Sequence, residues 1–137
     1  MEKISFPPYV EIIWLEDVNA VQAKWTELHL SLEKFKEVTD AVMKMLLSHN
    51  STIWIADQYN SEGVFNKKII DFITNELVGD AVTNYGIKLV LTVAPRVKGI
   101  SSLNTRRWLG DVQEMVDFTM ASFATIEDCK QWIHDNK

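Results

Sequence analysis

Cysteine, proline and glycine are scarce in this chain of 137 residues, which contains one, three and five of them respectively. A single cysteine excludes an internal disulfide framework, so we expect a cytoplasmic protein with a reduced thiol. Cys129 lies on the apolar face of the last expected helix, so we expect it to act as a small buried hydrophobic residue rather than as a nucleophile. The glycines match neither glycine-rich phosphate-binding pattern, and no G-x-S-x-G segment is present. The sequence therefore contains no recognisable nucleotide-binding loop and no nucleophile elbow.

Long apolar runs and clustered metal ligands are absent as well. The longest apolar runs, 12–15 and 53–56, have four residues, whereas a membrane-spanning helix needs about 20. We therefore expect no membrane span, and no apolar segment after the N-terminus is typical of a secretory signal. His29, His49 and His134 are far apart in the sequence, and no pair has the spacing of two ligands on one helix face. We expect neither a metal site nor a cofactor.

Charge is unevenly distributed along the chain. The net charge is −5, which argues against nucleic-acid binding. Residues 81–110 nevertheless contain five basic residues and no acidic one, which leaves a net charge of −10 for the rest. These basic residues are Lys88, Arg96, Lys98, Arg106 and Arg107. The segment predicts a local site for an anion or an acidic partner, and the alternative is a solvated loop and helix face.

Periodicity predicts strands and helices in alternation over a single domain, residues 1–137. Apolar and polar residues alternate over 9–16 and 20–28, which predicts an antiparallel hairpin at the edge of the sheet. Residues 1–8 are expected to be a lead-in segment outside the sheet, because proline cannot donate to a ladder. The other expected elements are strands over 52–56, 87–94 and 118–123 and helices over 31–49, 66–85, 103–116 and 126–133.

The expected order of elements is β-β-α-β-α-β-α-β-α, which defines an α/β fold. Strands that alternate with helices pair in parallel through right-handed crossovers. We therefore expect a mixed, mostly parallel sheet of five strands with helices packed on it. In this sheet the strands over 52–56 and 87–94 run side by side, so the loops that follow them share one edge. Open α/β sheets bind their ligands at this carboxyl edge.

The residues that follow the strand 52–56 are the first candidates for a site. Asp57 can act there as a base, accept a hydrogen bond or cap the turn 58–61, and capping is the conservative interpretation. Ser61 lies near the start of the second helix, whose N-terminus would stabilise a phosphate. Ser61 is therefore a candidate phosphorylation site, with an ordinary loop serine as the alternative.

The loop after Pro95 is expected at the same edge of the sheet. Arg96 and Lys98 provide cations, and Ser101 and Ser102 open a helix whose amide groups point outward. Together these residues predict an anion cradle. Trp108 fits the apolar stripe of that helix poorly, which makes it a candidate anchor for a partner.

Five short segments together carry a resemblance to a known family. They are YVEII (9–13), VQAKW (21–25), IWIAD (53–57), YGIKLV (85–90) and FATIEDCKQWI (123–133). With these segments the chain resembles, over nearly its whole length, the SpoIIAA-like branch of the STAS superfamily, small bacterial proteins that include the anti-sigma-factor antagonists. The resemblance implies a βα superhelix with a mixed sheet, and a regulatory or interaction role rather than catalysis.

The phosphorylation motif of that family is altered in this chain. In the anti-sigma-factor antagonists the phosphorylated serine follows the third strand within an Asp-Ser-Ser/Thr-Gly sequence. The corresponding stretch here is DQYNSEG (57–63), in which Gln58 stands at the position of the phosphoserine and Ser61 lies further along. Relatives in this branch are also likened to lipid-carrier folds, which implies an apolar ligand as an alternative.

These observations favour a non-catalytic module that binds a protein partner or a small, anionic ligand at the carboxyl edge of the sheet. Its expected contact residues are Asp57, Gln58, Tyr59, Arg96, Lys98, Ser101, Ser102 and Trp108. Two alternatives stay open: a carrier of an apolar ligand between helix and sheet, and a small enzyme with Asp57 as base and Arg96 as anion clamp. Self-association into a homodimer is compatible with each of them.

Overall fold

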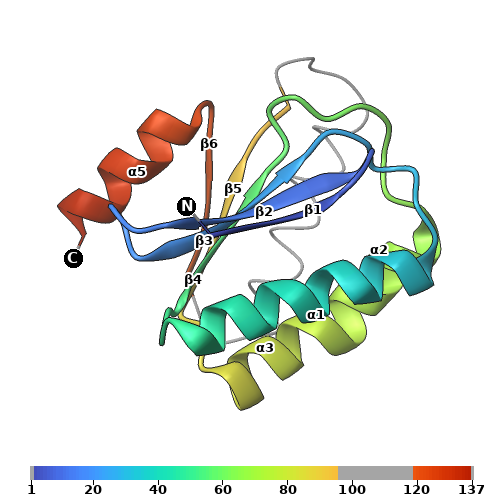
Figure 1. Ribbon diagram of the computed structural model, residues 1–137, viewed down its shortest axis with the longest axis horizontal. Helices are drawn as coiled ribbons and strands as arrows, with labels where there is room; N and C mark the ends of the chain where they lie inside the picture. Colours follow the sequence, from blue (N-terminus) through green and yellow to red (C-terminus); the bar gives the residue numbers. More distant parts are fainter. Residues whose placement is uncertain (1, 96–118, 137) are drawn as a thin grey trace.

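The protein folds around a six-stranded mixed sheet with helices on both faces (Figure 1). The computed structural model describes residues 2–95 and 119–136. The strands are β1 (Lys3–Phe6), β2 (Val10–Leu15), β3 (Ala20–Trp25), β4 (Ile53–Asp57), β5 (Leu89–Val93) and β6 (Thr119–Phe123). They lie in the sheet in their order along the chain; β1, β2 and β3 pair antiparallel, and β3 to β6 pair in parallel. The expected α/β class, the antiparallel hairpin and the parallel pairing of β4 with β5 are confirmed.

The expectation of five strands and of a lead-in outside the sheet is wrong. Residues 3–6 form β1, which pairs antiparallel with β2 and takes the edge position that we assigned to the hairpin. Pro7 and Pro8 lie in the turn after β1, where the backbone N–H of Tyr9 donates to the carbonyl of Phe6 at 2.8 Å. Proline is tolerated there because a residue in this turn does not have to donate a backbone hydrogen bond to a neighbouring strand.

The helices begin at side-chain caps. Ser31 caps α1 (Leu32–Ser48), and its hydroxyl accepts a hydrogen bond from the N–H of Lys34 at 3.1 Å. Thr125 caps α5 (Ile126–Asp135) in the same way, by accepting from the N–H of Asp128 at 3.1 Å. Each cap satisfies one of the N–H groups that the first helical turn leaves without a partner.

The expected helix over 66–85 is continuous but changes its winding. It consists of α2 (Lys67–Phe72), the π-helical η1 (Ile73–Leu77) and α3 (Val78–Tyr85). Gly86 follows with φ of 67°, the left-handed conformation that glycine adopts at low cost after a helix. The helix expected over 103–116 lies outside the described residues.

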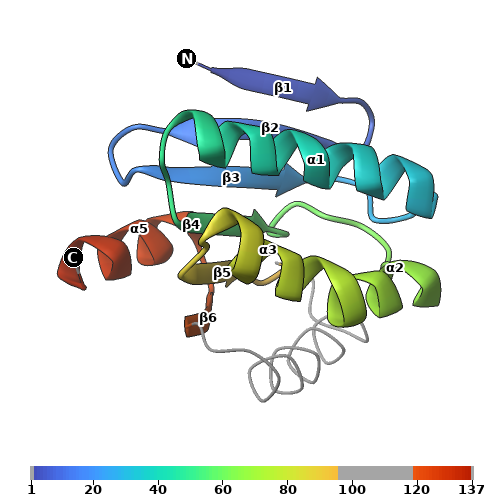
Figure 2. The same ribbon diagram turned by 90° about the horizontal axis from the view of Figure 1, so that it is seen from below.

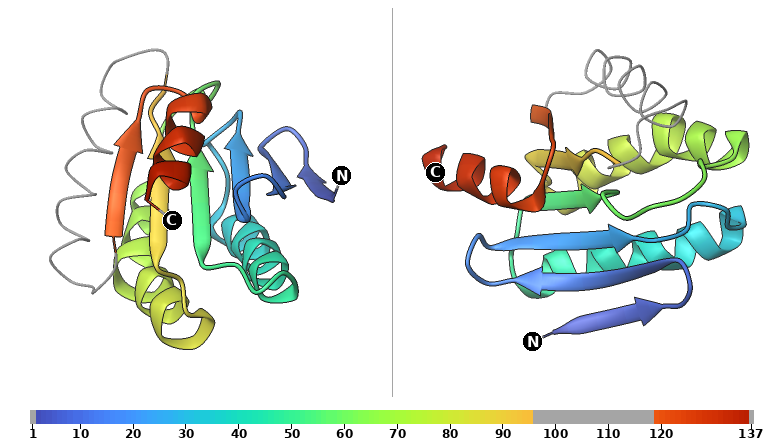
Figure 3. Two further views of the ribbon diagram at one scale, coloured as in Figure 1. Left: turned by 90° about the vertical axis from the view of Figure 1, so that its left-hand side faces the viewer. Right: turned by 90° about the horizontal axis from the view of Figure 1, so that it is seen from above.

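Each face of the sheet has its own core. Alternate residues of β2 and β3, such as Ile12, Val21 and Ala23, pack under α1, which crosses these two strands (Figure 2). The side chains of α2 and η1 extend the same core. On the other face α5 packs on β5 and β6 (Figure 3), with Cys129 and Ile133 against the sheet. The period-two alternation of the strands thus distributes apolar side chains to both faces.

The helices of the described ranges are those of a sheet-covering α/β fold. None of them combines the length and the apolar character that a membrane crossing requires. α1 has 17 residues and carries a buried stripe on one side and charged residues on the other.

Candidate functional site

The carboxyl ends of β4 and β5 lie side by side, as the sequence predicted, and the carboxyl end of β6 lies next to that of β5. Asp57 is the last residue of β4 and pairs in register with Val93 of β5. The N–H of Gln58 donates to the carbonyl of Val93 at 2.9 Å, and the N–H of Ala94 donates to the carbonyl of Phe123 at 2.8 Å. These bonds hold the starts of the loops after β4 and β5 at one edge of the sheet.

Asp57 is buried, with 4% of its surface exposed, and both of its carboxylate oxygens accept hydrogen bonds. Oδ2 accepts from Nε2 of Gln22 at 2.7 Å, and Oδ1 accepts from the N–H of Tyr59 at 3.0 Å. Gln22 comes from β3 and is itself buried. The carboxylate thus caps the turn after β4 and ties that turn to the neighbouring strand, which is the conservative role expected from the sequence.

The turn held by Asp57 is closed by Ser61. The N–H and the hydroxyl of Ser61 both donate to the carbonyl of Gln58, at 3.0 and 2.7 Å. Ser61 is half-buried, and the cap of α2 is made by Asn66, whose Oδ1 accepts from the N–H of Ile69. A phosphate on Ser61 would therefore replace a hydrogen bond within the turn.

A second set of contacts anchors the remainder of this loop to the end of β3. The N–H of Glu62 donates to the carbonyl of Thr26 at 3.1 Å, and the N–H of Leu28 donates to the carbonyl of Glu62 at 3.0 Å. Gly63 follows with φ of 81°, and a Cβ at this position would lie 3.0 Å from Cδ2 of His29. Glycine is required there both by the backbone conformation and by the space available.

Among the described residues of this edge, Tyr59 is an exposed aromatic side chain. It is 39% exposed and directly follows the buried Gln58. Its backbone is fixed by Asp57, so the ring stands on a turn that is ordered before any partner binds. Arg96, Lys98, Ser101, Ser102 and Trp108, the other expected contact residues, lie outside the described residues.

The sequence did not predict that Gln22 donates a hydrogen bond to Asp57. The hairpin pattern assigned Gln22 to a polar, solvent-facing side of its strand, but β3 is an interior strand and Gln22 is only 7% exposed. The signal available in the sequence was that Gln22, a polar residue, lies between two apolar residues of its strand. Its partner could be found only from the parallel pairing of β3 with β4.

Cys129 lies under the same edge, on the inner face of α5. The thiol is fully buried, and burial raises its pKa to about 12, with a further increase from the negative charge of Asp57 and an opposing effect of Lys130. At neutral pH the thiol is protonated and therefore a poor nucleophile. The expectation of a small buried hydrophobe is confirmed.

The described residues offer no arrangement of ligands for a metal. Within 2–95 and 119–136, no three His, Cys, Asp or Glu side chains are placed to hold an ion together. The charged groups near the loop contacts are Glu27 and Glu62, and Glu27 accepts from the N–H of His29 at 2.8 Å. Lys24 lies in register with Asp57 at the end of β3, so the described portion of this edge carries charges of both signs.

No protein-family model, no curated protein and no solved structure matches the chain. The α/β class and the mixed sheet consequently rest on the structure itself. The likeness to the SpoIIAA-like branch stays a prediction from the sequence motifs.

Proposed function

We propose that the chain is a non-catalytic regulatory or interaction module of the SpoIIAA-like kind. It binds a protein partner or a small ligand through the loops at the carboxyl edge of β4 and β5. The observation that carries the proposal is the use of Asp57: both carboxylate oxygens are engaged in holding the turn that presents Tyr59.

The hydrogen bonds of Asp57 favour a binding role over catalysis. A general base needs an oxygen that can reach the proton of a substrate, but Asp57 is only 4% exposed and each of its oxygens has a protein donor at 2.7 or 3.0 Å. The same bonds make the turn rigid, which lowers the entropic cost of binding through it. No contact within the described part of the chain favours the enzyme or the apolar-ligand carrier in a comparable way.

Tyr59 has the properties of an interface anchor. Tyrosine combines a large apolar ring with a hydroxyl group and loses little side-chain entropy when it is buried, so it is enriched at binding hot spots. Pro95 directly precedes Arg96 and is itself buried near the end of β5. In the sequence the basic segment begins directly after this residue, and its charge is the reason to propose a negatively charged group on the ligand or partner.

Affinity capture with matched surface variants tests the proposal. Whole tagged chain is expressed in the source cell as wild type, as Tyr59→Ala and as Leu47→Ala, and the captured proteins are compared. Leu47 is an exposed apolar residue of α1, 53% exposed, and controls for a general loss of surface hydrophobicity. We expect a partner that is captured by wild type and Leu47→Ala but is reduced at least about tenfold with Tyr59→Ala.

A parallel measurement addresses the small-ligand form of the proposal. The melting temperature is recorded with inorganic phosphate as a simple anion, for wild type and for Arg96→Glu with Lys98→Glu. Stabilisation by phosphate that the double variant loses supports an anion site at this edge. If neither capture nor melting distinguishes the variants from wild type, the carboxyl edge is not the binding surface and the proposal fails.

A further inference from the structure

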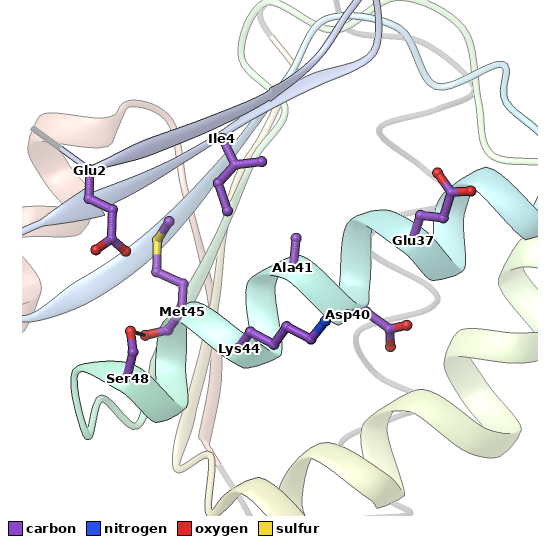
Figure 4. A pocket seen from close by; sticks show the side chains of 8 residues that line it. All are labelled: Glu2, Ile4, Glu37, Asp40, Ala41, Lys44, Met45 and Ser48. Carbon is purple, nitrogen blue, oxygen red and sulfur yellow. Dashed lines mark hydrogen bonds between the residues drawn. The ribbon is translucent and has the colours of Figure 1, made fainter.

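An open groove lies between the edge strand β1 and helix α1, at the end of the sheet farthest from β6 (Figure 4). Its volume is about 560 Å³. The apolar part of its lining is formed by Ile4 of β1 and by Ala41 and Met45 of α1. Ile4 is 39% exposed, one of the few large apolar side chains of the described residues that reach the surface to this extent.

Within the part of the chain that the structure describes, the backbone of β1 has hydrogen-bonding groups without partners beside this groove. β1 is the end strand of the sheet, and β2 is its neighbour on one side. The N–H of Trp14 donates to the carbonyl of Glu2 at 3.0 Å, and in an antiparallel pair the bonded positions alternate. Ile4 is therefore bonded to β2, whereas the N–H and C=O groups of Lys3 and Ser5 point away from the sheet, where a further strand could pair with them.

The start of β1 is held in place at the groove. His49, which follows α1, stacks on the indole of Trp14 with ring centroids 3.9 Å apart. Its Nε2 lies 3.1 Å from one carboxylate oxygen of Glu2 and 3.2 Å from the other. Strand addition would thus take place on an edge that is already ordered, which favours affinity.

The charges that line the groove indicate the kind of partner. Glu2, Glu37 and Asp40 contribute three carboxylates, of which Glu37 pairs with Nζ of Lys34 at 3.0 Å, and Lys44 contributes one ammonium group. A second copy of the chain, paired edge to edge about a two-fold axis, would bring this acidic groove against itself. Like charges across an interface cost several kcal/mol, so a positively charged partner fits better than a second copy.

We propose that the groove between β1 and α1 binds a basic, extended segment of a partner protein, which adds to β1 as a seventh strand. Its backbone pairs with Lys3 and Ser5. Alternate side chains of the segment lie on Ile4, Ala41 and Met45, because successive residues of a strand point to opposite faces. Lysine or arginine residues of the segment reach the carboxylates of the rim. This surface is separate from the carboxyl edge and does not depend on the function proposed there.

Peptide selection against the whole chain tests this inference. A displayed library of random peptides of about twelve residues, long enough to span a strand, is selected on wild type and counter-selected on Ser5→Pro. Proline at this position removes the outward N–H of Ser5 but leaves the bonds of β1 with β2 intact. We expect peptides that bind wild type alone and combine lysine or arginine with alternating apolar residues.

Matched variants then localise the best of these peptides. We expect the Kd to rise by more than about tenfold with Ser5→Pro and by roughly tenfold with Asp40→Lys at low salt. Ser5→Ala, Glu76→Lys and Tyr59→Ala should leave the Kd within about twofold of wild type, because they keep the strand edge and the charge of the groove. The unchanged affinity of Tyr59→Ala separates this surface from the one proposed above.

Three results would overturn the inference. The first is that no peptide distinguishes wild type from Ser5→Pro although circular dichroism shows both to be folded. The second is that the selected peptides are neutral or acidic, or bind Asp40→Lys as tightly as wild type. The third is a wild-type dimer in light scattering that Ser5→Pro dissociates, which would make a second copy the occupant of the edge.

Discussion

The two faces of the sheet differ in how much of them the described helices cover. α1, α2, η1 and α3 cover one face over a large aliphatic and aromatic core, whereas the core under α5 is smaller. The buried polar pair, Gln22 and Asp57, belongs to the face of α5. Gln22 lies in register with Ile55, and Asp57 follows Ile55 by two residues, so all three point to the same side.

The two faces therefore contribute differently to the fold, one through apolar packing and the other through a buried polar pair. Dense apolar packing under α1 supplies most of the hydrophobic stabilisation of the described fold. The face on which α5 is the described helix can accommodate a buried carboxylate, because Gln22 and the turn supply its hydrogen bonds. The predictions below test this comparison, either between the two faces or within the face of α5.

The largest effect is expected from truncation of the core under α1. Leu46→Ala should lower the free energy of unfolding by about 4 kcal/mol, and Ile133→Ala under α5 by about 2–3 kcal/mol. Both residues are almost completely buried, but α5 is the last helix and can shift to close a cavity more easily. Urea unfolding of the two variants measures the difference. A larger loss for Ile133→Ala would reverse the comparison.

Removal of the buried carboxylate should rank next. Asp57→Ala leaves the amide of Gln22 and the N–H of Tyr59 without an acceptor, and should cost about 2–3 kcal/mol. In a double-mutant cycle with Gln22→Ala, the double variant should lose about 1–2 kcal/mol less free energy of unfolding than the sum of the two single variants. Additive losses would show that the pair does not couple β3 to the turn.

The thiol under α5 gives a pH-dependent prediction. Because the pKa of Cys129 is raised to about 12 in the folded chain, the protonated thiol stabilises the fold below the unfolded pKa of about 9, and this contribution is lost as the pH rises towards 12. Between pH 9 and 10 the loss should be about 1 kcal/mol relative to Cys129→Ala. Urea titrations of both proteins at several pH values isolate the effect of the thiol. Parallel pH profiles would contradict it.

The smallest effects are expected at the two helix caps. Ser31→Ala at α1 and Thr125→Ala at α5 should each cost about 1 kcal/mol, because both hydroxyls accept one N–H at 3.1 Å. Thr125→Ser should restore most of the stability at α5. Hydrogen exchange should show faster opening of α5 than of α1 in the matched variants, since the core beneath α5 is smaller. Equal protection of the two helices would refute that part of the comparison.

Much of the fold was predictable because its signals are local. The caps at Ser31 and Thr125, the left-handed Gly86 and the apolar stripe of α1 depend on residues only a few positions apart. The position of Asp57 at the carboxyl edge followed from strand order and from the handedness of the crossovers. β1 escaped prediction because it is only four residues long and ends at two prolines.

The sequence by itself determined the described helices, the strands β2 to β6, the direction in which β4 and β5 run, and that Cys129 faces the core, because periodicity and turn residues act over short distances along the chain. Tertiary structure alone decided that Gln22 donates a hydrogen bond to Asp57 and that Glu62 donates one to the carbonyl of Thr26. It also decided that β1 forms the edge of the sheet beside α1. Gln22 and Asp57 are 35 residues apart in the sequence. Contacts of this kind depend on which strands become neighbours in the sheet, and only the folded chain establishes that arrangement.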